Sequence, residues 1–331
     1  MPGRSIVNQG ALIKRETTAG TADITTMKRV LGLKVMNGWT DDGESFTASG
    51  SKVPTSYVYN TNLGEHEVES LQDYNAMTYT LCGGFGAPVT TTPTGGTLSR
   101  LHTYTLNSAG ADPLASFTVM WGDAIHALQL KHFVFTSLTL GIERTSLTLD
   151  SAAMSHEPIT GIALPTVGIT EVGSVPVAGK SWDAYLDTTY AALGTTKLLA
   201  AYNGSVDFPD KYSPDWVINS ANPSFDSLQE SEDFEPEVEL TLGFDTTSIS
   251  LINGFTAGAV RFLRLKTTGP IIEGAIPYSL EVDLAIRIIT RGTMTTSDAG
   301  SVQVPFTAQV TRDPVSGNSA VARLVNTVTA L

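Results

Sequence analysis

Hydrophobic residues alternate with small or polar residues along the segment TSLTLGIERTSLTLD, residues 136–150. Apolar side chains occupy every second position in two runs on either side of Arg144: Leu138, Leu140, Ile142, Leu147 and Leu149. A period of two places these side chains on one face of extended strands and the Thr, Ser and acidic side chains on the other. The pattern predicts two strands with an apolar face in a core and a polar face exposed to water.

The same kind of pattern recurs along most of the chain. Thr, Val, Ile and Phe dominate these runs, and Gly, Pro, Asn and Asp separate them. The runs that predict strands are LHTYTL (101–106), SFTVMW (116–121), LKHFVFTSLTL (130–140), EVELTL (237–242), VRFLRLKT (260–267), LEVDLAIRII (280–289) and VQVPFTAQV (302–310). The sequence therefore predicts a mainly β protein.

Two segments depart from this pattern. Residues 65–82, EHEVESLQDYNAMTYTLC, predict a helix, because apolar residues follow a 3-and-4 spacing and acidic residues stand at its start; GGFG at 83–86 would end it. Residues 39–64 are rich in Gly, Ser, Thr and Asp and predict a long loop or an extended arm.

The length of 331 residues leaves the domain organisation open. One interpretation is a single domain over 1–331, with an N-terminal arm or loop over about 1–64 and a C-terminal segment over about 314–331. The alternative is two duplicated β units, about 1–165 and 166–331. It rests on an echo between LTLGIERTSLTL, starting at Leu138, and LTLGFDTTSISL, starting at Leu240.

The chain is acidic, with a formal net charge of −13. Acidic residues accumulate between 207 and 239, where Lys211 is the one basic residue. Such a run is typical of a solvated loop, and it also suits a face that repels an anion. Because DNA is gripped by Lys and Arg, the composition argues against DNA binding while allowing DNA to pass nearby.

The motifs of known chemistry are incomplete. GSVPVAGKS (173–181) has its first Gly one residue too far back for a phosphate loop. Ser155-His156-Glu157 has triad residue types in adjacent positions, which rarely face one another. His126 and His132 lack a third zinc ligand. We therefore expect no catalytic, cofactor-binding or metal-binding residues, no cofactor, and no enzyme.

Single residues of reactive, modifiable or ligand-binding types are also consistent with non-functional interpretations. Cys82 is the sole cysteine and predicts an inert buried thiol. The sequon Asn203-Gly204-Ser205 lacks a readable secretion signal beside it. The tryptophans are scattered, at 39, 121, 182 and 216. No apolar run approaches the roughly 18 residues of a membrane span, so no membrane association is expected.

The order of segments resembles one known family. ALIKRETTAGTADI near the start, SLQDYNAMTYTLCGGFG, FTSLTLGIERTSLTLD and the closing VPFTAQVTRDPVSGNSAVARLVNTV are similar to segments of the tail tube proteins, or major tail proteins, of long-tailed bacteriophages with non-contractile tails. Together these segments span nearly the whole chain.

This resemblance implies an architecture and a role. The fold would be a β-sandwich or half-barrel of the tail tube type, with a flanking short α-helix and long extended loops. Subunits would form hexameric rings, or trimeric rings if the chain is duplicated, stacked into a hollow tube through which genome DNA leaves the virion. Partners would be copies of the chain, the tape measure protein and the tail terminator. The loop at 39–64 and the segment after Pro314 would clasp neighbouring subunits or rings.

Two other classes fit the same composition. One is another β-rich virion shell or decoration protein. The other is a carbohydrate-binding adhesin, whose scattered Trp and Tyr would stack on sugars.

Overall fold

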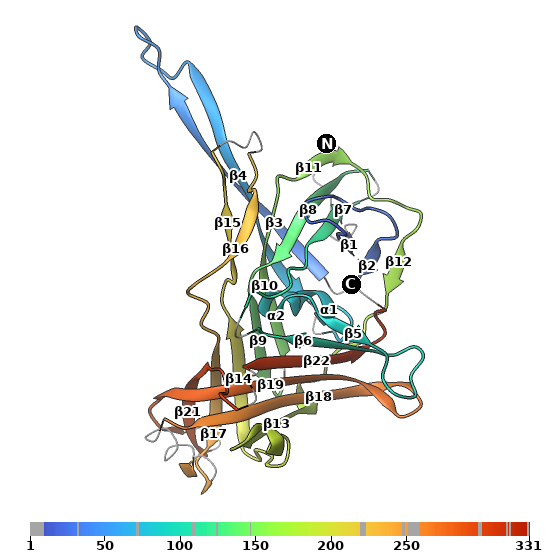
Figure 1. The fold of residues 1–331 in the computed structure, drawn as a ribbon, viewed down its shortest axis with the longest axis vertical. Helices are drawn as coiled ribbons and strands as arrows, with labels where there is room; N and C mark the ends of the chain where they lie inside the picture. The colour runs from blue at the N-terminus through green and yellow to red at the C-terminus, as the bar shows by residue number, and fades with distance from the viewer. Residues whose placement is uncertain are drawn as a thin grey trace.

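The computed structural model describes residues 10–31, 33–70, 73–107, 110–123, 125–145, 147–218, 223–246, 249–250, 258–296, 300–315, 317, 319–329 and 331. The chain is mainly β (Figure 1), which confirms the predicted fold class. The strands of the first half are β1 (Gly10–Arg15), β2 (Lys28–Val30), β3 (Leu33–Phe46), β4 (Ser56–Ser70), β5 (Val89–Thr91), β6 (Arg100–Thr105), β7 (Phe117–Gly122), β8 (Ala127–Phe135), β9 (Leu138–Glu143), β10 (Leu147–Ser155) and β11 (Ile159–Ile162).

The second half of the chain is also built mainly of strands. Its strands are β12 (Thr170–Val172), β13 (Trp182–Asp187), β14 (Ala201–Phe208), β15 (Tyr212–Asp215), β16 (Ser227–Glu230), β17 (Glu237–Gly243), β18 (Val260–Glu273), β19 (Ile276–Arg291), β20 (Thr295–Thr296), β21 (Val302–Val310) and β22 (Ala320–Asn326). The short helices are α1 (Met77–Thr80), α2 (Cys82–Phe85), η2 (Gly179–Ser181) and η3 (Tyr190–Ala192).

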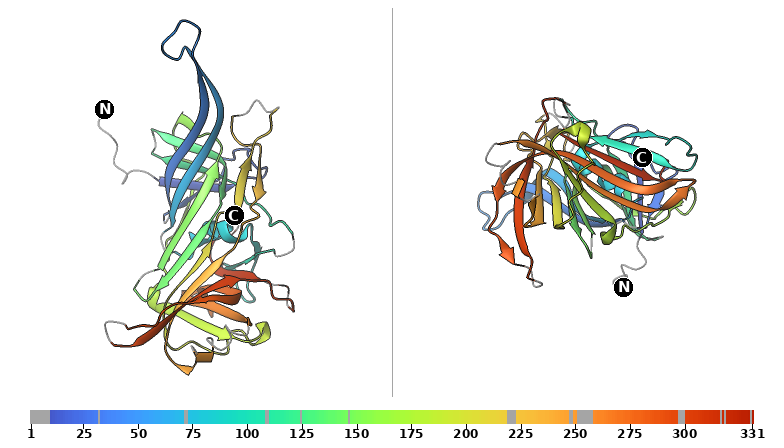
Figure 2. Two further views of the ribbon diagram at one scale, coloured as in Figure 1. Left: turned by 90° about the vertical axis from the view of Figure 1, so that its left-hand side faces the viewer. Right: turned by 90° about the horizontal axis from the view of Figure 1, so that it is seen from below.

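One antiparallel ladder, which we call the long sheet, runs through the whole molecule. Its strands follow one another in the order β3, β4, β10, β9, β14, β17, β21 and then the last residues of β19 with β20. β9 and β14 join the two halves of the chain. A second layer packs on the apolar face of this sheet, and α1 and α2 lie between the layers (Figure 2).

The second layer contains two similar groups of strands. β1 pairs with β7, β7 with β8, and β8 with β11. In the second half β13 pairs with β18, β18 with β19, and β19 with β22, all antiparallel as in the first half. β8 and β9 follow each other across a short break, and β19 makes the same passage from the second layer to the long sheet in one strand.

The core confirms the alternation that predicts strands at 138–150. Leu138, Leu140, Leu147 and Leu149 are buried in the main apolar cluster, which contains side chains from both halves. Aromatic side chains fill its centre, with the Phe85 ring 4.8 Å from the ring of Phe208. Burial of such side chains supplies most of the stabilising free energy.

The predicted helix over 65–82 is wrong in its first part. Residues 65–70 belong to β4, in which Gly64, His66 and Val68 are buried while Glu65 and Glu67 are exposed. The glutamates alternate with buried residues at a period of two, so they belong to one face of a strand and not to a helix start. Among the described residues of 65–86, helix forms only in α1 and α2, whose residues are all buried. Leu71 and Gln72 lie outside the described residues.

Of the two alternatives for 39–64, the long loop is mostly wrong, because 39–46 and 56–64 are strand residues, and the extended arm agrees with the structure. β3 and β4 form a hairpin whose far end, the arm (residues 39–64), extends beyond the rest of the chain (Figures 1 and 2). Its strands carry polar residues on both faces, so no period of two is visible in the sequence.

Much of the C-terminal segment has partners within its own chain. β22 pairs with β19 and β6 of its own chain, and Asn326 is fully buried. The Asn326 side-chain amide donates to the Tyr74 carbonyl at 2.8 Å and the Thr78 hydroxyl at 2.6 Å. Residues 320–326 therefore form part of the chain's own sheet, and the clasp expected for the segment after Pro314 stays a prediction.

Candidate functional site: the acidic face of the long sheet

The outer side of the long sheet carries a row of carboxylates that we call the acidic face. Alternation along β4, β9, β10, β14 and β17 turns one set of side chains away from the core, and the strand pairings bring them side by side. Its members are Glu65, Glu67, Glu69, Glu143, Asp150, Asp207, Glu237 and Glu239. The acidic run at 207–239, for which a solvated loop and an anion-repelling face are the two expectations, contributes strand residues to this face.

Few cations offset these carboxylates. Lys34 on β3 pairs with Glu69 at 2.7 Å, and Arg287 lies at the opposite end of the ladder, next to Gln309. In the middle, Asp207 and Glu237 are directly opposed, an arrangement that costs free energy through like-charge repulsion. Between the carboxylates the face is lined by small residues such as Gly141, Thr148 and Ser205. Such a surface repels a polyanion and offers it little to hold.

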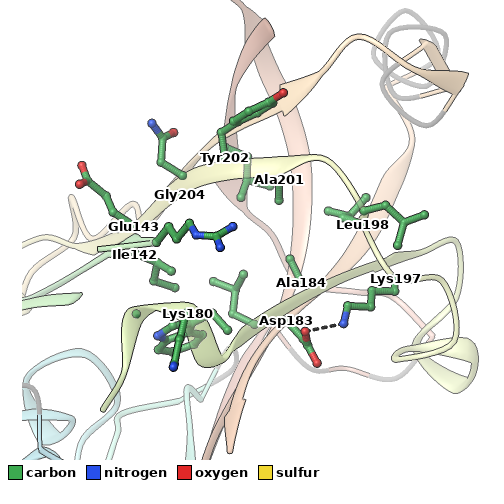
Figure 3. Close-up of a pocket in the computed structure, with 17 residues that line it drawn as sticks. Ile142, Glu143, Lys180, Asp183, Ala184, Lys197, Leu198, Ala201, Tyr202 and Gly204 are labelled. Carbon is green, nitrogen blue, oxygen red and sulfur yellow. Dashed lines mark ion pairs between the residues drawn. The ribbon is translucent and has the colours of Figure 1, made fainter. Parts of the chain in front are cut away.

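The near-miss phosphate loop borders a separate pocket of about 420 Å³ (Figure 3). Gly179-Lys180-Ser181 forms η2, a 3₁₀ turn lying against the end of β9, and a Cβ at Gly179 would lie 2.6 Å from the Glu143 carbonyl oxygen. The glycine is therefore required by packing. Lys197 lines the same pocket and pairs with Asp183 at 2.5 Å. No strand-loop-helix cradle surrounds Lys180, so the turn has no phosphate-binding geometry.

The five histidines include one exposed ring and a group of three buried rings. His126 is exposed, whereas His132 is buried and its Nδ1 lies 3.1 Å from Nε2 of His156. Ser155 is fully buried; its hydroxyl donates to the His156 carbonyl at 2.8 Å, and Nε2 of His66 lies 2.8 Å from the same hydroxyl oxygen. Ser155 thus has no access to a substrate. We call His66, His132 and His156 the histidine cluster.

Burial governs the protonation of the histidine cluster. It lowers the pKa of His66, of His132 and of His156 to about 4 in each case, because the charged imidazolium loses its hydration. His132 and His156 also share one N–H between facing nitrogens, an arrangement that two charged rings could not keep. The cluster is therefore neutral at pH 7 and serves packing.

Glu16 links this cluster to the segment RETTAGTA of residues 15–22. Its buried carboxylate accepts the N–H of Gly20 at 2.8 Å, the N–H of His132 at 2.9 Å and the hydroxyl of Thr118 at 3.1 Å. The segment is a turn folded around one acceptor. Neither Glu16 nor His66 is apparent from the sequence, since each has a partner more than 80 positions away: His132 for Glu16 and Ser155 for His66.

The remaining residues named in the sequence analysis lie in the core, on strands or at separate points of the surface. Burial raises the pKa of the Cys82 thiol to about 12, which leaves it unreactive. Asn203, Gly204 and Ser205 lie on β14. Of the tryptophans, Trp39 is exposed on β3, while Trp121, Trp182 and Trp216 are half-buried. They come from distant elements and share no platform.

Lys211, the one cation of the acidic run, does not offset the carboxylates beside it in sequence. It is buried and pairs with the buried Asp112, which lies in the first half of the chain. The ammonium also lies 5.6 Å from the ring centre of Tyr212 and 5.7 Å from that of Phe234. This ion pair links the first half of the chain to the second half.

Within the described ranges, no group of three or more His, Cys, Asp or Glu residues is placed to hold a metal ion. The same part of the chain contains no helix with the length and apolar character to cross a membrane. A scan of protein-family models and a search of curated proteins found no match to this sequence.

Proposed function

We propose that the chain is a structural, non-enzymatic virion protein that assembles with copies of itself into stacked rings, forming the hollow tail tube of a long-tailed phage. The observation that carries this proposal is the acidic face, which continues across both halves of one sheet. A wall of carboxylates and small polar residues lets DNA pass without adhering.

The arm supports the same role. It exposes apolar and aromatic side chains far from the core: Phe46, Val53, Tyr57, Val58 and Tyr59. A monomer in water gains nothing from such a surface, whereas a neighbouring subunit would bury it. In the proposed tube the arm docks on a subunit of the adjacent ring. The tape measure protein and the tail terminator are the further partners that the family resemblance implies.

Electron microscopy of the purified protein tests this function. We expect rings and, at higher protein concentration, hollow tubes. Discrete small particles at every salt and protein concentration would contradict the proposal. An ordered closed shell, or binding to a glycan array that is lost in Trp39→Ala, would instead favour the shell and adhesin alternatives.

A shortened arm separates the two levels of assembly. Replacing residues 44–58 with a tight turn leaves the paired base of β3 and β4 in place. This variant is expected to form rings that do not stack. Normal tube length in this variant would contradict the proposed docking of the arm.

A further inference from the structure

Within the described part of the chain, the outermost strands at the two ends of the long sheet have a strand partner on one side. β3 is hydrogen-bonded to β4 along one side, and its other side has no strand partner among the described residues. At the opposite end, β21 is the strand partner of residues 291–296 among the described residues, and the first described pair between β18 and β19 is Val260 with Arg287. Open edges of this kind pair with another chain unless something covers them.

Equivalent positions in the two halves can be assigned from the ladder itself. In the first half, Phe135, Ala153, His66 and Asn37 are opposed in one row across the sheet. In the second half, the corresponding row is Ile288, Ala308, Val238 and Val206. Both rows lie beside a one-residue shift in register, between Phe135 and Thr139 and between Ile288 and Thr290.

Counting outward from these rows gives two further correspondences. β9, residues 138–143, corresponds to residues 291–296. Residues 203–208 of β14 correspond to residues 34–39 of β3. The echo between Leu138 and Leu240 aligns β9 with β17 instead, so it pairs strands that occupy different places in the ladder.

The junction between β9 and β14 is therefore a template for the two free ends. In that junction Leu138 is opposite Phe208, and Gly141 is opposite Ser205. The corresponding pairs at the free ends are Arg291 with Trp39 and Met294 with Met36.

We propose that residues 291–296 of one copy pair antiparallel with residues 34–39 of a second copy, in the register of the β9–β14 junction. The partner is thus another molecule of this chain, and the contact continues the acidic face. The count of chains in a closed ring rests on the proposed function: a ring of six equivalent β units would contain three chains.

Exposure of the side chains supports this pairing. Leu138 and Phe208 are each 1% exposed, whereas Trp39, in the place of Phe208, is 52% exposed. Met36 and Met294 are 40% and 47% exposed on the outer side of the sheet. A second copy would cover all three, and it would set the two methionines against each other.

Charge supports the same orientation. The edge at residues 287–291 carries Arg287 and Arg291, and β3 carries Asp41, Asp42 and Glu44. In the proposed register the Arg291 guanidinium lies against the Trp39 ring, with Asp41 diagonally adjacent. Opposite charges on the two edges favour head-to-tail pairing of chains.

Disulfide trapping tests the register. In Met36→Cys/Met294→Cys, the two thiols of neighbouring copies are directly opposed, at a Cα separation that fits a disulfide. Cys82 is buried and does not compete. Under mild oxidation we expect linked dimers and trimers on a denaturing gel, with the ladder ending at three chains. The matched control is Thr40→Cys/Met294→Cys, which is four residues out of register and is expected to stay monomeric on the gel.

The outcomes separate this inference from the proposed function. Cross-linking of the matched pair alone supports the register, whether or not tubes are seen. Tubes in the microscope with no cross-link, or with equal cross-linking of the control pair, would overturn the register and leave the tube function standing. A trapped ladder ending at six chains would overturn the three-chain ring while keeping the junction.

Discussion

In the first half of the chain the centre of the ladder holds His66, and the corresponding place in the second half holds Val238. His66 belongs to a cluster of neutral, buried imidazoles that surrounds the RETTAGTA turn. The second half has instead an ion network on β18, β19 and β22, in which buried Asp283 accepts from Arg264 and Arg323, each at 2.6 Å. The same order of strands is thus compatible with two kinds of polar chemistry.

The largest effect is expected at the ion pair that joins the halves. Lys211→Met leaves the buried Asp112 carboxylate without its cation and should lower the free energy of unfolding by about 3–5 kcal/mol. Urea denaturation measures it. The control is Lys197→Ala, which breaks an exposed pair and should lower the free energy of unfolding far less. Equal losses in the two variants would contradict a buried link between the halves.

Glu16 tests the polar centre of the first half. Glu16→Gln places an amide group among three donors and should cost about 1–3 kcal/mol, measured by urea denaturation. Glu157→Gln changes an exposed side chain of the same type and should lie within about 0.5 kcal/mol of the parent. A loss no greater than this control would show that the turn does not depend on the carboxylate.

The histidine cluster predicts a pH dependence. Its folded-state pKa values of about 4 lie below the ordinary value near 6.5, so the unfolded chain binds more protons between these limits. Stability should therefore fall as pH falls through this window, with the melting temperature about 5–10 °C lower at pH 5 than at pH 7 by calorimetry.

His66→Val, which copies the residue of the second half, sharpens this test. It removes one buried titratable group, so the melting temperature should change less between pH 7 and pH 5 than in the parent. An unchanged slope would place the pH response outside the histidine cluster.

The smallest effect concerns the acidic face. Glu237→Gln relieves repulsion with Asp207 and should raise the free energy of unfolding by a few tenths of a kcal/mol. Glu69→Gln should lower it by a similar amount, because Glu69 pairs with Lys34. High-precision thermal unfolding in low salt measures both. Changes in the free energy of unfolding with the same sign in both variants would contradict a repulsion between Asp207 and Glu237.

The sequence predicted much of the fold where one face of a strand is buried. The alternation at 138–150 identified β9 and β10 because Leu and Thr separate cleanly between core and water. It failed for Glu65, Glu67 and Glu69, where a strand with small or polar buried partners imitated a helix start. It failed also for the arm, since strands wet on both faces have no hydrophobic period.

The candidate site was less accessible to sequence reasoning. The acidic run pointed to Asp207, Glu237 and Glu239, but their alignment with Glu65 and Glu67 depends on pairings between distant strands. The contacts of Glu16 and His66 join segments about a hundred positions apart. No local spacing encodes such partners, and only the folded chain brings them together.

The one-residue shifts at Phe135–Thr139 and Ile288–Thr290 have a mechanical consequence. At each of them a strand leaves one layer and enters the other, so each acts as a corner of fixed angle between the layers. Two such corners in every molecule would set how steeply successive molecules lean, and therefore the bore of any cylinder they enclose. Deleting a single residue at either corner should change that bore before it changes the fold.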